Sequence, residues 1–375
     1  IDASAPADLI RGENALVTLR RRAADTPLYL VGGSVRDALL GQRPLDLDIA
    51  VDGPVAPLAS GLDPDAVLHQ RFDTAAASVG DRRLDLARTR SETYRRPGAL
   101  PEVEPADIES DLARRDFTIN AMAVDLDDPE VLIDPHGGVE DLRRGAIRVL
   151  HPGSFSDDPT RALRAARYVA RLGFDIDHRT ADLLREVDLK TVSPKRLRSE
   201  MALISDEPGA LEALRLVSAW GLIAISEEDL GLIAAAFNTL ERPAWRGFCS
   251  RAEVVDAVVG GSDSGEFREL LEYPGSPSRA RATAERHDPV QALLARASGA
   301  EWLDNWLSEW RGIEIEISGN DLVDAGIERG RAVGAGLDAA MEAALDSGVA
   351  DRESQLSVAL EAARAEAGRE EEDQI

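Results

Sequence analysis

Cysteine, lysine and aromatic residues are scarce in this chain of 375 residues. Cys249 is the one cysteine, so no disulfide within the chain is possible and we expect a reducing compartment. No run approaches the roughly 20 apolar residues of a membrane-spanning helix, and the first residues lack the basic head and apolar run of a secretory signal. These absences predict a cytoplasmic protein of two or three globular domains without membrane contact.

Basic residues are also in the minority, because 43 of them face 69 acidic residues and leave a net charge of −26. The excess is uneven: residues 1–200 carry a net charge of −7, whereas residues 201–375 carry −19. Nearly all the basic residues are arginines, since Lys190 and Lys195 are the only lysines. Such a charge argues against a protein that coats nucleic acid through bulk electrostatics, so any contact with nucleic acid must be local.

Two kinds of pattern divide the chain. Residues 28–150 mix short strand-like runs with short helical patterns, whereas from about residue 155 the periodicity is helical almost throughout. We therefore predict an α+β protein with four parts, namely an N-terminal segment (1–27), a small α/β head (28–150), a helical neck (151–215), and a helical body and tail (216–375). The strands predicted in the head cover residues 28–31, 45–51, 84–88, 121–126, 131–133 and 147–150.

A glycine pair follows the first predicted strand. Gly32 and Gly33 form a turn into a short helix, where backbone N–H groups can approach an anion and Arg36 can add a charged fork. This geometry suits a phosphate. An ordinary tight turn between a strand and a helix gives the same pattern.

Two carboxylates alternate with apolar residues in the predicted strand 45–51. Side chains two apart point to one face, so Asp46 and Asp48 lie side by side, while the apolar residues, Leu45 included, face the core. Adjacent carboxylates repel each other unless they share a hard cation such as Mg²⁺. Asp85, in another predicted strand, could complete a trio of carboxylates that bind the cation. The alternative is that these aspartates occupy solvent-facing positions of their strands.

Residues 111–123 form a third constellation. Asp111 is predicted to cap a helix on which Arg115 presents a cation, while Asp116 and Asn120 present a carboxylate and an amide at i,i+4 spacing. Arg115 would contact a triphosphate, and Asp116 and Asn120 a ribose. A solvated helix face with an Asp/Arg pair is the alternative.

A second helix, with an aspartate cap and Pro159 in its first turn, is predicted after residue 155. Asp158 is the cap, and Arg161, Arg164 and Arg167 recur every three residues, so we expect them to share a face. Such a face could instead be solvated or contact an RNA backbone, and Arg171 is assigned to that kind of surface.

Four motifs in this order resemble the head motifs of the class II tRNA nucleotidyltransferase and bacterial poly(A) polymerase family: residues 31–37, 45–50, 114–123 and 134–142. The resemblance is dense over residues 28–200, and residues 317–322 are similar to a segment of the family's C-terminal helical region. It implies a nucleotidyltransferase-type head followed by a helical neck, body and tail. The implied reaction is transfer from CTP and ATP to the tRNA 3′ end, with release of pyrophosphate by a two-metal mechanism.

The resemblance also assigns roles to residues of this chain. It implies that Mg²⁺ binds Asp46 and Asp48, that Asp85 joins them as a catalytic residue, and that the nucleotide contacts Gly32, Gly33, Arg36, Arg115, Asp116, Asn120, Asp158, Arg161, Arg164 and Arg167. Asp158 and Arg161 would read the base. A carboxylate only accepts hydrogen bonds and a guanidinium only donates, which fits the adjacent amine and ring-nitrogen acceptor of cytosine and of adenine but not guanine or uracil.

Several alternatives stay open. The family pattern commonly has Glu-Asp where this chain has Asp157 and Asp158, so full CCA addition, CC-only or A-only addition, and poly(A) synthesis all remain, as does a regulator that binds nucleotide or RNA without catalysis. Residues 88–105 correspond to a mobile loop region of the family. Residues 192–200 resemble its next helical motif, where an Arg/Glu pair stiffens the base-reading helix. Oligomeric state is not predicted. For tRNA contact we expect a narrow basic stripe near the neck: Arg179, Arg185, Lys195, Arg196 and Arg198.

Overall fold

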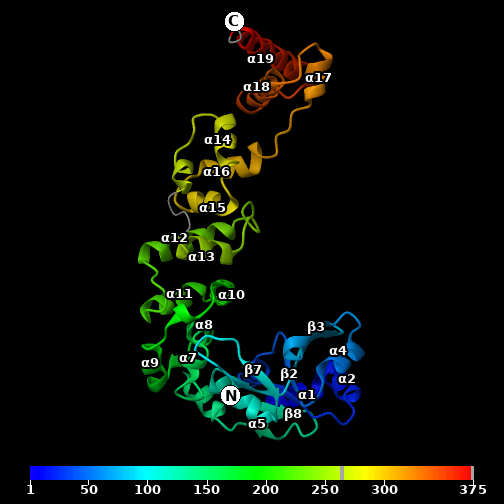
Figure 1. Ribbon diagram of the computed structural model, residues 1–375, viewed down its shortest axis with the longest axis vertical. Coiled ribbons are helices and arrows are strands. Elements are labelled where there is room, and N and C mark those ends of the chain that lie inside the picture. The colour runs from blue at the N-terminus through cyan, green and yellow to red at the C-terminus, as the bar shows by residue number, and fades with distance from the viewer. Residues whose placement is uncertain (262–265, 373–375) are drawn as a thin grey trace. The chain divides into compact units, whose positions relative to one another are not determined.

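The computed structural model describes residues 1–261 and 266–372, which belong to two compact units, Ile1–Ala224 and Ile225–Ile375 (Figure 1). The predicted α+β class is confirmed, because the first unit holds a mixed sheet with helices and the described part of the second unit is helical. None of the described helices combines the length and apolar character that a membrane span needs.

A seven-stranded sheet organises the first unit. Its strand order is β3-β4-β5-β2-β1-β8-β9, and every neighbouring pair is antiparallel except β2 and β5, which are parallel. Apolar residues from the three central strands are fully buried against the helices. The strands are β1 (Leu28–Val31), β2 (Leu47–Val51), β3 (Val67–His69), β4 (Thr74–Val79), β5 (Arg82–Arg88), β8 (Ala123–Asp125) and β9 (Leu132–Ile133).

Two further ribbons of two strands each accompany this sheet. β6 (Arg90–Thr93) pairs antiparallel with β7 (Glu102–Pro105), and β10 (Ala146–Ile147) pairs in parallel with β11 (Asp175–Ile176). The β6–β7 ribbon occupies the segment that the sequence analysis assigned to a mobile loop region. Neither it nor the pair β3 and β4 was predicted.

Eleven α-helices cover the sheet and continue the chain through the first unit. They are α1 (Ala5–Gly12), α2 (Asn14–Arg22), α3 (Gly32–Leu39), α4 (Val55–Leu62), α5 (Ile108–Ala113), α6 (Gly138–Arg144), α7 (Ser154–Asp157), α8 (Arg161–Leu172), α9 (His178–Leu184), α10 (Pro194–Ser205) and α11 (Ala210–Ala219). Short 3₁₀ turns interrupt them: η1 (Gln70–Phe72), η2 (Thr118–Asn120) and η3 (Leu189–Thr191).

The second unit contains α12 (Glu227–Leu240), α13 (Arg251–Val259), η4 (Glu266–Leu270), α14 (Pro277–Ala284), α15 (Pro289–Ala297), α16 (Trp302–Asn305), the π-helical turn η5 (Trp306–Trp310), α17 (Gly319–Asp324), α18 (Arg331–Ser347) and α19 (Arg352–Glu372). Trp245 is fully buried there and donates from Nε1 to Oδ1 of Asp304 over 2.7 Å. α18 and α19 pack closely at Gly336, where a Cβ would lie 2.7 Å from the Ala359 carbonyl oxygen.

Candidate active site

A cavity of about 780 Å³ in the first unit gathers nearly all the predicted site residues. Its lining comes from the strands near the middle of the sheet, from the β6–β7 ribbon and from α8. The predicted residues in this lining are Gly32, Gly33, Arg36, Asp46, Asp48, Asp85, Arg115, Asp116, Asn120, Asp158, Arg161 and Arg164. Residues that lie far apart in the sequence therefore form one polar cavity.

The β1–α3 turn needs both of its glycines because two charged side chains approach its backbone. Gly32 has φ +62°, and a Cβ there would lie 2.7 Å from Nη1 of Arg115. A Cβ on Gly33 would lie 3.2 Å from Oδ2 of Asp48. The Gly32 N–H donates to the carbonyl of Met122 at 3.2 Å, so that amide is not free to bind an anion. The turn thus packs against the carboxylate and the guanidinium.

Asp48 and Asp85 are register partners on the two parallel strands β2 and β5. Ser34 fixes the start of β2, because its Oγ donates to the Asp46 carbonyl at 3.1 Å and accepts the Asp48 N–H at 2.8 Å. Burial raises the pKa of Asp48, the negative charge of Asp85 adds to this rise, and Arg115 opposes it. The sheet therefore brings two of the three predicted carboxylates together and places one of them where its charge is disfavoured.

Asp46 lies just before β2 and is exposed. The prediction that Leu45 faces the core was wrong, since its side chain is 83% exposed. Among the described residues, no three His, Cys, Asp or Glu side chains are grouped closely enough to hold a metal ion. Asp85 is also engaged by Arg83, whose Nε lies 3.2 Å from Oδ1.

Arg36 is buried in the cavity wall with its hydrogen bonds already made. Its Nη2 lies 2.6 Å from Oδ1 of Asp37, its Nη1 donates to Oδ1 of Asn120 at 2.7 Å, and its guanidinium lies 5.3 Å from the centre of the Tyr168 ring. Asn120 in turn donates from Nδ2 to Oδ1 of Asp116 at 3.1 Å. These contacts hold the predicted phosphate and ribose ligands in one network.

The prediction that Asp111 caps a helix was wrong. Asp111 lies inside α5, and Asp107 is the cap, because its side chain accepts the Ser110 N–H. Asp111 is 1% exposed and accepts hydrogen bonds from Arg114 at 2.8 Å and from Arg115 at 2.9 Å. Burial alone would raise the pKa of Asp111, but the two guanidiniums outweigh it, so the pKa lies below its usual value. The helix ends at Ala113, so the prediction that Arg115, Asp116 and Asn120 lie on it was wrong.

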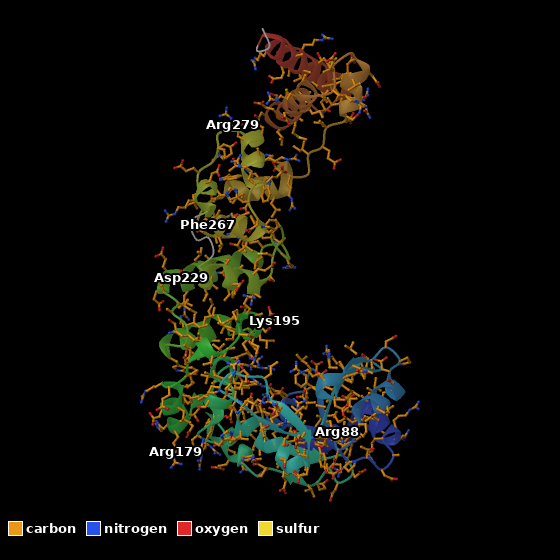
Figure 2. The ribbon with its side chains drawn as sticks, viewed as in Figure 1. Arg88, Arg179, Lys195, Asp229, Phe267 and Arg279 are labelled. Atoms are coloured by element: carbon orange, nitrogen blue, oxygen red, sulfur yellow. The ribbon has the colours of Figure 1, made fainter. Side chains whose placement is uncertain are left out.

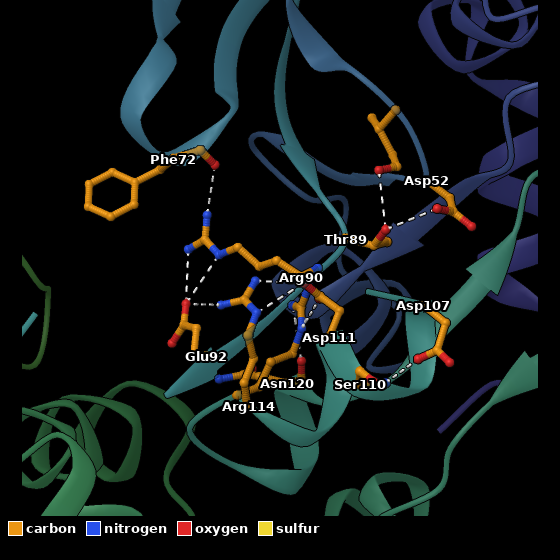
Figure 3. Close-up of polar contacts among 12 residues, drawn as sticks. Asp52, Phe72, Thr89, Arg90, Glu92, Asp107, Ser110, Asp111, Arg114 and Asn120 are labelled. Atoms are coloured by element: carbon orange, nitrogen blue, oxygen red, sulfur yellow. Dashed lines mark hydrogen bonds and ion pairs between the residues drawn. The ribbon is translucent and has the colours of Figure 1, made fainter. Parts of the chain in front are cut away.

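The β6–β7 ribbon contributes cavity residues that sequence reasoning missed. Figure 3 shows Arg90 donating to the Phe72 carbonyl and to Glu92, while Arg114 reaches the same Glu92 oxygen at 2.8 Å. The second Glu92 oxygen accepts the Tyr94 hydroxyl at 2.8 Å. The sequence signal that could have revealed these residues is the i,i+2 spacing of Arg90 and Glu92, because side chains two residues apart lie on the same face of a strand.

Asp158 and Arg161 both line the cavity, but they are held separately. The prediction that Asp158 caps the helix was wrong, because α8 begins at Arg161 with Thr160 at its N-cap, and Asp158 lies in the extended link after α7. Oδ1 of Asp158 accepts from Thr160 Oγ1 at 2.8 Å and from Arg196 Nη2 at 2.8 Å. Arg161 donates to Ser154 Oγ at 2.7 Å and to the carbonyl of Arg114 at 2.6 Å. Each side chain therefore has a fixed direction before any ligand binds.

Asp116, which is buried, forms an ion pair with Arg164, whose side chain is 32% exposed; Oδ2 and Nη2 lie 2.6 Å apart. Asp116 raises the pKa of Arg164 above its usual value, although burial acts in the opposite direction. Arg167 is not part of the cavity lining and pairs with Glu207 at 3.6 Å. Arg171, which the sequence analysis assigned to the surface, lines the cavity together with Tyr168.

Comparison with known proteins finds a match to the family model described as the poly A polymerase head domain, over residues 28–148. The chain is 30% identical to an A-adding tRNA nucleotidyltransferase of Geobacter sulfurreducens over an alignment that covers 90% of this chain and 45% of that protein. It is 44% identical to a CC-adding tRNA nucleotidyltransferase of Deinococcus radiodurans, with 54% of this chain and 56% of that protein covered. The chain thus spans about half the length of these curated relatives.

Solved structures of similar proteins match over more of their length. Apo form II of a CCA-adding enzyme has a TM-score of 0.77 and 28% identity, covering 94% of this chain and 97% of that one. The Thermotoga maritima CCA-adding enzyme complexed with tRNA has a TM-score of 0.72 and 27% identity, covering 95% and 98%. A CCA-adding enzyme complexed with ATP has a TM-score of 0.72 and 27% identity, covering 92% and 94%.

Proposed function

We propose that the chain belongs to the class II tRNA nucleotidyltransferase and bacterial poly(A) polymerase family, which its relatives and the match over residues 28–148 support, and that it transfers nucleotides from CTP and ATP to the 3′ end of tRNA and releases pyrophosphate. One observation carries this proposal: a single cavity combines the Asp48 and Asp85 carboxylates with Arg115, Asp158 and Arg161. Asp48, Asp85 and Arg115 suit chemistry on a phosphate, and Asp158 and Arg161 suit the choice of a base. The proposed reaction needs both kinds of group in one cavity. A cytoplasmic location follows from the proposed substrate.

Base choice rests on Asp158 and Arg161. The carboxylate offers only acceptors and the guanidinium only donors, so together they complement the amine and the neighbouring ring nitrogen of cytosine or adenine. Guanine and uracil present the reverse order and leave both groups unpaired, which discriminates by a factor of order 10⁴ when the groups are desolvated. The separate anchoring of the two side chains supports this role, because neither has to reorganise when a base arrives.

The triphosphate is placed by the guanidiniums of Arg115, Arg164 and Arg171, which line the cavity from two sides. Arg36 contributes less directly, because it orients Asn120, and Asn120 is hydrogen-bonded to Asp116. Asp116 is the predicted ribose ligand, and its ion pair with Arg164 connects the ribose and phosphate sites. The reaction requires positioning and charge stabilisation, without a covalent intermediate on the protein.

Asp48 and Asp85, with Asp46 beside them, fit a hard divalent cation such as Mg²⁺. Mg²⁺ in proteins uses one or two carboxylates and completes its shell with water and substrate phosphates, and two register-paired carboxylates are such a set. The raised pKa of Asp48 supports this assignment, because a cation would relieve both its burial and its repulsion from Asp85. When bound, the cation would neutralise charge on the phosphates and favour loss of the hydroxyl proton.

The exact addition is tested by sequencing the 3′ ends made from three tRNAs: one that lacks CCA, one that lacks only the terminal A, and complete tRNA. Restoration of CCA on the first tRNA indicates full CCA addition. Addition of CC to the first tRNA alone indicates a CC-adding enzyme, and addition of A to the second tRNA alone indicates an A-adding enzyme. A tail on complete tRNA indicates poly(A) synthesis. A protein that binds ATP but releases no pyrophosphate with any of them is a binding protein, and the proposal then fails.

A further inference from the structure

The face of the sheet that carries the carboxylates continues beyond Asp85 as an open surface. Strand pairing places Asp48 opposite Asp85, Asp85 opposite Ala76, and Ala76 opposite Val67. Residues paired in this way point to the same face, so the four side chains form one row from the middle of the sheet to its edge strand β3. The row passes directly from the two carboxylates to small and apolar residues.

Small side chains lie beside Asp85 on this face of the sheet. The next row on the same face is Ala87, Thr74 and His69, each opposite the next. We name Thr74, Ala76 and Ala87 the β4 floor; all three are half-buried, and all three line the cavity, as does His69. Small side chains leave space above the sheet here, whereas the opposite face of the same strands is buried in the core.

Large apolar side chains border the β4 floor without being covered. Leu45 is 83% exposed and lines the cavity immediately before Asp46. Val67 on the edge strand, in the same row as Asp85 and Ala76, is 57% exposed. Exposed apolar side chains beside a polar cavity are typical of a surface that contacts a ligand. A flat, partly apolar group fits this border better than a phosphate does.

The proposed reaction requires a second ligand on this side of the carboxylates. Attacking and leaving oxygens lie roughly in line on opposite sides of the transferred phosphorus. The triphosphate and base ligands come from α3, from the segment after α5 and from α8, which contacts that segment through Arg161 and Arg164. In the sheet order, β1 and β8 lie on one side of β2, and β5, β4 and β3 lie on the other.

We propose that the β4 floor and Leu45 bind the 3′-terminal nucleoside of the acceptor RNA, which presents its hydroxyl beside Asp85. This inference rests on the proposed function and deepens it by assigning the acceptor site. Arg83 lies on the same face of β5, two residues before Asp85, and its side chain is 59% exposed. It supplies a cation for the phosphate that precedes the terminal nucleoside.

The test separates acceptor binding from nucleotide binding. Ala76→Leu fills the floor, so we expect the KM for acceptor tRNA to rise at least about fivefold, equivalent to about 1 kcal/mol, while the Kd for CTP or ATP measured without tRNA stays within about twofold. Ser60→Leu is the control, since Ser60 is exposed on α4 and does not line the cavity. Leu45→Ser is a second variant whose folding is safe, because Leu45 is already exposed.

An unchanged acceptor KM in both Ala76→Leu and Leu45→Ser overturns the acceptor site. Equal weakening of tRNA and nucleotide binding by both variants also overturns it, because the floor would then belong to the nucleotide site. A wild-type protein that extends no tRNA at all contradicts the proposed function instead, so the two failures are distinguishable.

Discussion

Arg196 donates a hydrogen bond from Nη2 to Oδ1 of Asp158, with the two atoms 2.8 Å apart. The other end of the same guanidinium, Nη1, donates to the carbonyl of Gly98 at 3.0 Å. Arg196 therefore connects α10, the tip of the β6–β7 ribbon and the carboxylate proposed to read the base. Arg196 was predicted to belong to a basic stripe for tRNA, but its guanidinium is already engaged by Asp158 and Gly98.

Loss of this contact should relax base selection. In Arg196→Ala, Asp158 keeps only its Thr160 contacts among those described, so its carboxylate can turn. We expect incorporation of UTP and GTP relative to CTP and ATP to rise about tenfold, equivalent to about 1.4 kcal/mol of lost discrimination. Competition assays with the four triphosphates measure this ratio. Lys195→Ala, at the exposed neighbouring position, is the control, and a parallel fall for all four substrates would contradict the assignment.

Replacing Asp48 with Asn should abolish incorporation without destabilising the protein. The folded-state pKa of Asp48 is raised, chiefly by burial, so the contribution of this group to stability is greatest below the usual carboxyl pKa of 3.8 and falls as pH rises through the folded pKa. At pH 7 the charge is therefore a cost that Asn removes. We expect less than about 5% of the wild-type rate, together with an unchanged or higher Tm. Asp81→Asn, an exposed carboxylate in the β4–β5 turn, should change neither quantity.

The Asp116–Arg164 pair should show the opposite behaviour. The pKa of Asp116 is lowered, because Arg164 and its hydrogen bonds outweigh burial, so its contribution to stability is present above pH 3.8 and is lost as pH falls through the folded pKa. Asp116→Asn removes the main partner of a guanidinium that is partly exposed and also interacts with Glu200, so we expect a loss of about 1–3 kcal/mol in the free energy of unfolding at pH 7. Urea unfolding at pH 7 and at pH 3 measures the difference, which should shrink at the lower pH.

The exposed pair Arg185 and Asp182 provides the comparison for that measurement, since their side chains are 78% and 69% exposed. Asp182→Asn should cost only about 0–1 kcal/mol. Equal losses from Asp182→Asn and Asp116→Asn would mean that the Asp116–Arg164 pair does not stabilise the fold more than an exposed pair does.

Binding of tRNA should depend weakly on salt. Of the predicted stripe, four residues are exposed; one of them, Arg185, pairs with Asp182, and the other three are Arg179, Lys195 and Arg198. Figure 2 shows Arg179 and Lys195 among the side chains of the first unit. Few phosphates are then neutralised, so we expect a slope of log K against log salt equivalent to about two to four contacts, at about −0.9 per contact. Replacing all three residues by Ala should flatten the slope further. A steep slope, or one that these substitutions leave unchanged, would contradict this placement.

The sequence was a good guide where the relevant chemistry is local. A glycine pair after a strand, or two aspartates two residues apart, can be identified from adjacent residues, and Gly32, Gly33, Asp46 and Asp48 all line the cavity. Leu45 was misjudged because the end of a strand depends on its partners. Pairing with β5 begins only at Leu47, which pairs with Leu84, so the residues before it have no ladder to hold them in the sheet.

Longer-range contacts explain the other differences. Asp111 resembles a helix cap in the sequence, and only Arg90, Arg114 and Arg115 make it a buried hub. On α8, a spacing of three falls short of the roughly 3.6 residues per turn, so the face of Arg161 and Arg164 has rotated away by Arg167. Tyr168, four residues after Arg164, and Arg171, three residues after Tyr168, return to the face of Arg161 and Arg164. They therefore line the cavity in place of Arg167.

The Asp116–Arg164 pair also has a consequence for biosynthesis. Asp116 leaves the ribosome well before Arg164, and until α8 follows, a carboxylate that is 5% exposed in the finished protein lacks its cation. Domains usually complete their folding in order of synthesis. Here we expect the sheet-bearing part to wait for the helices after it, so that residues 1–224, and not the head alone, are the shortest nascent chain that acquires protease resistance.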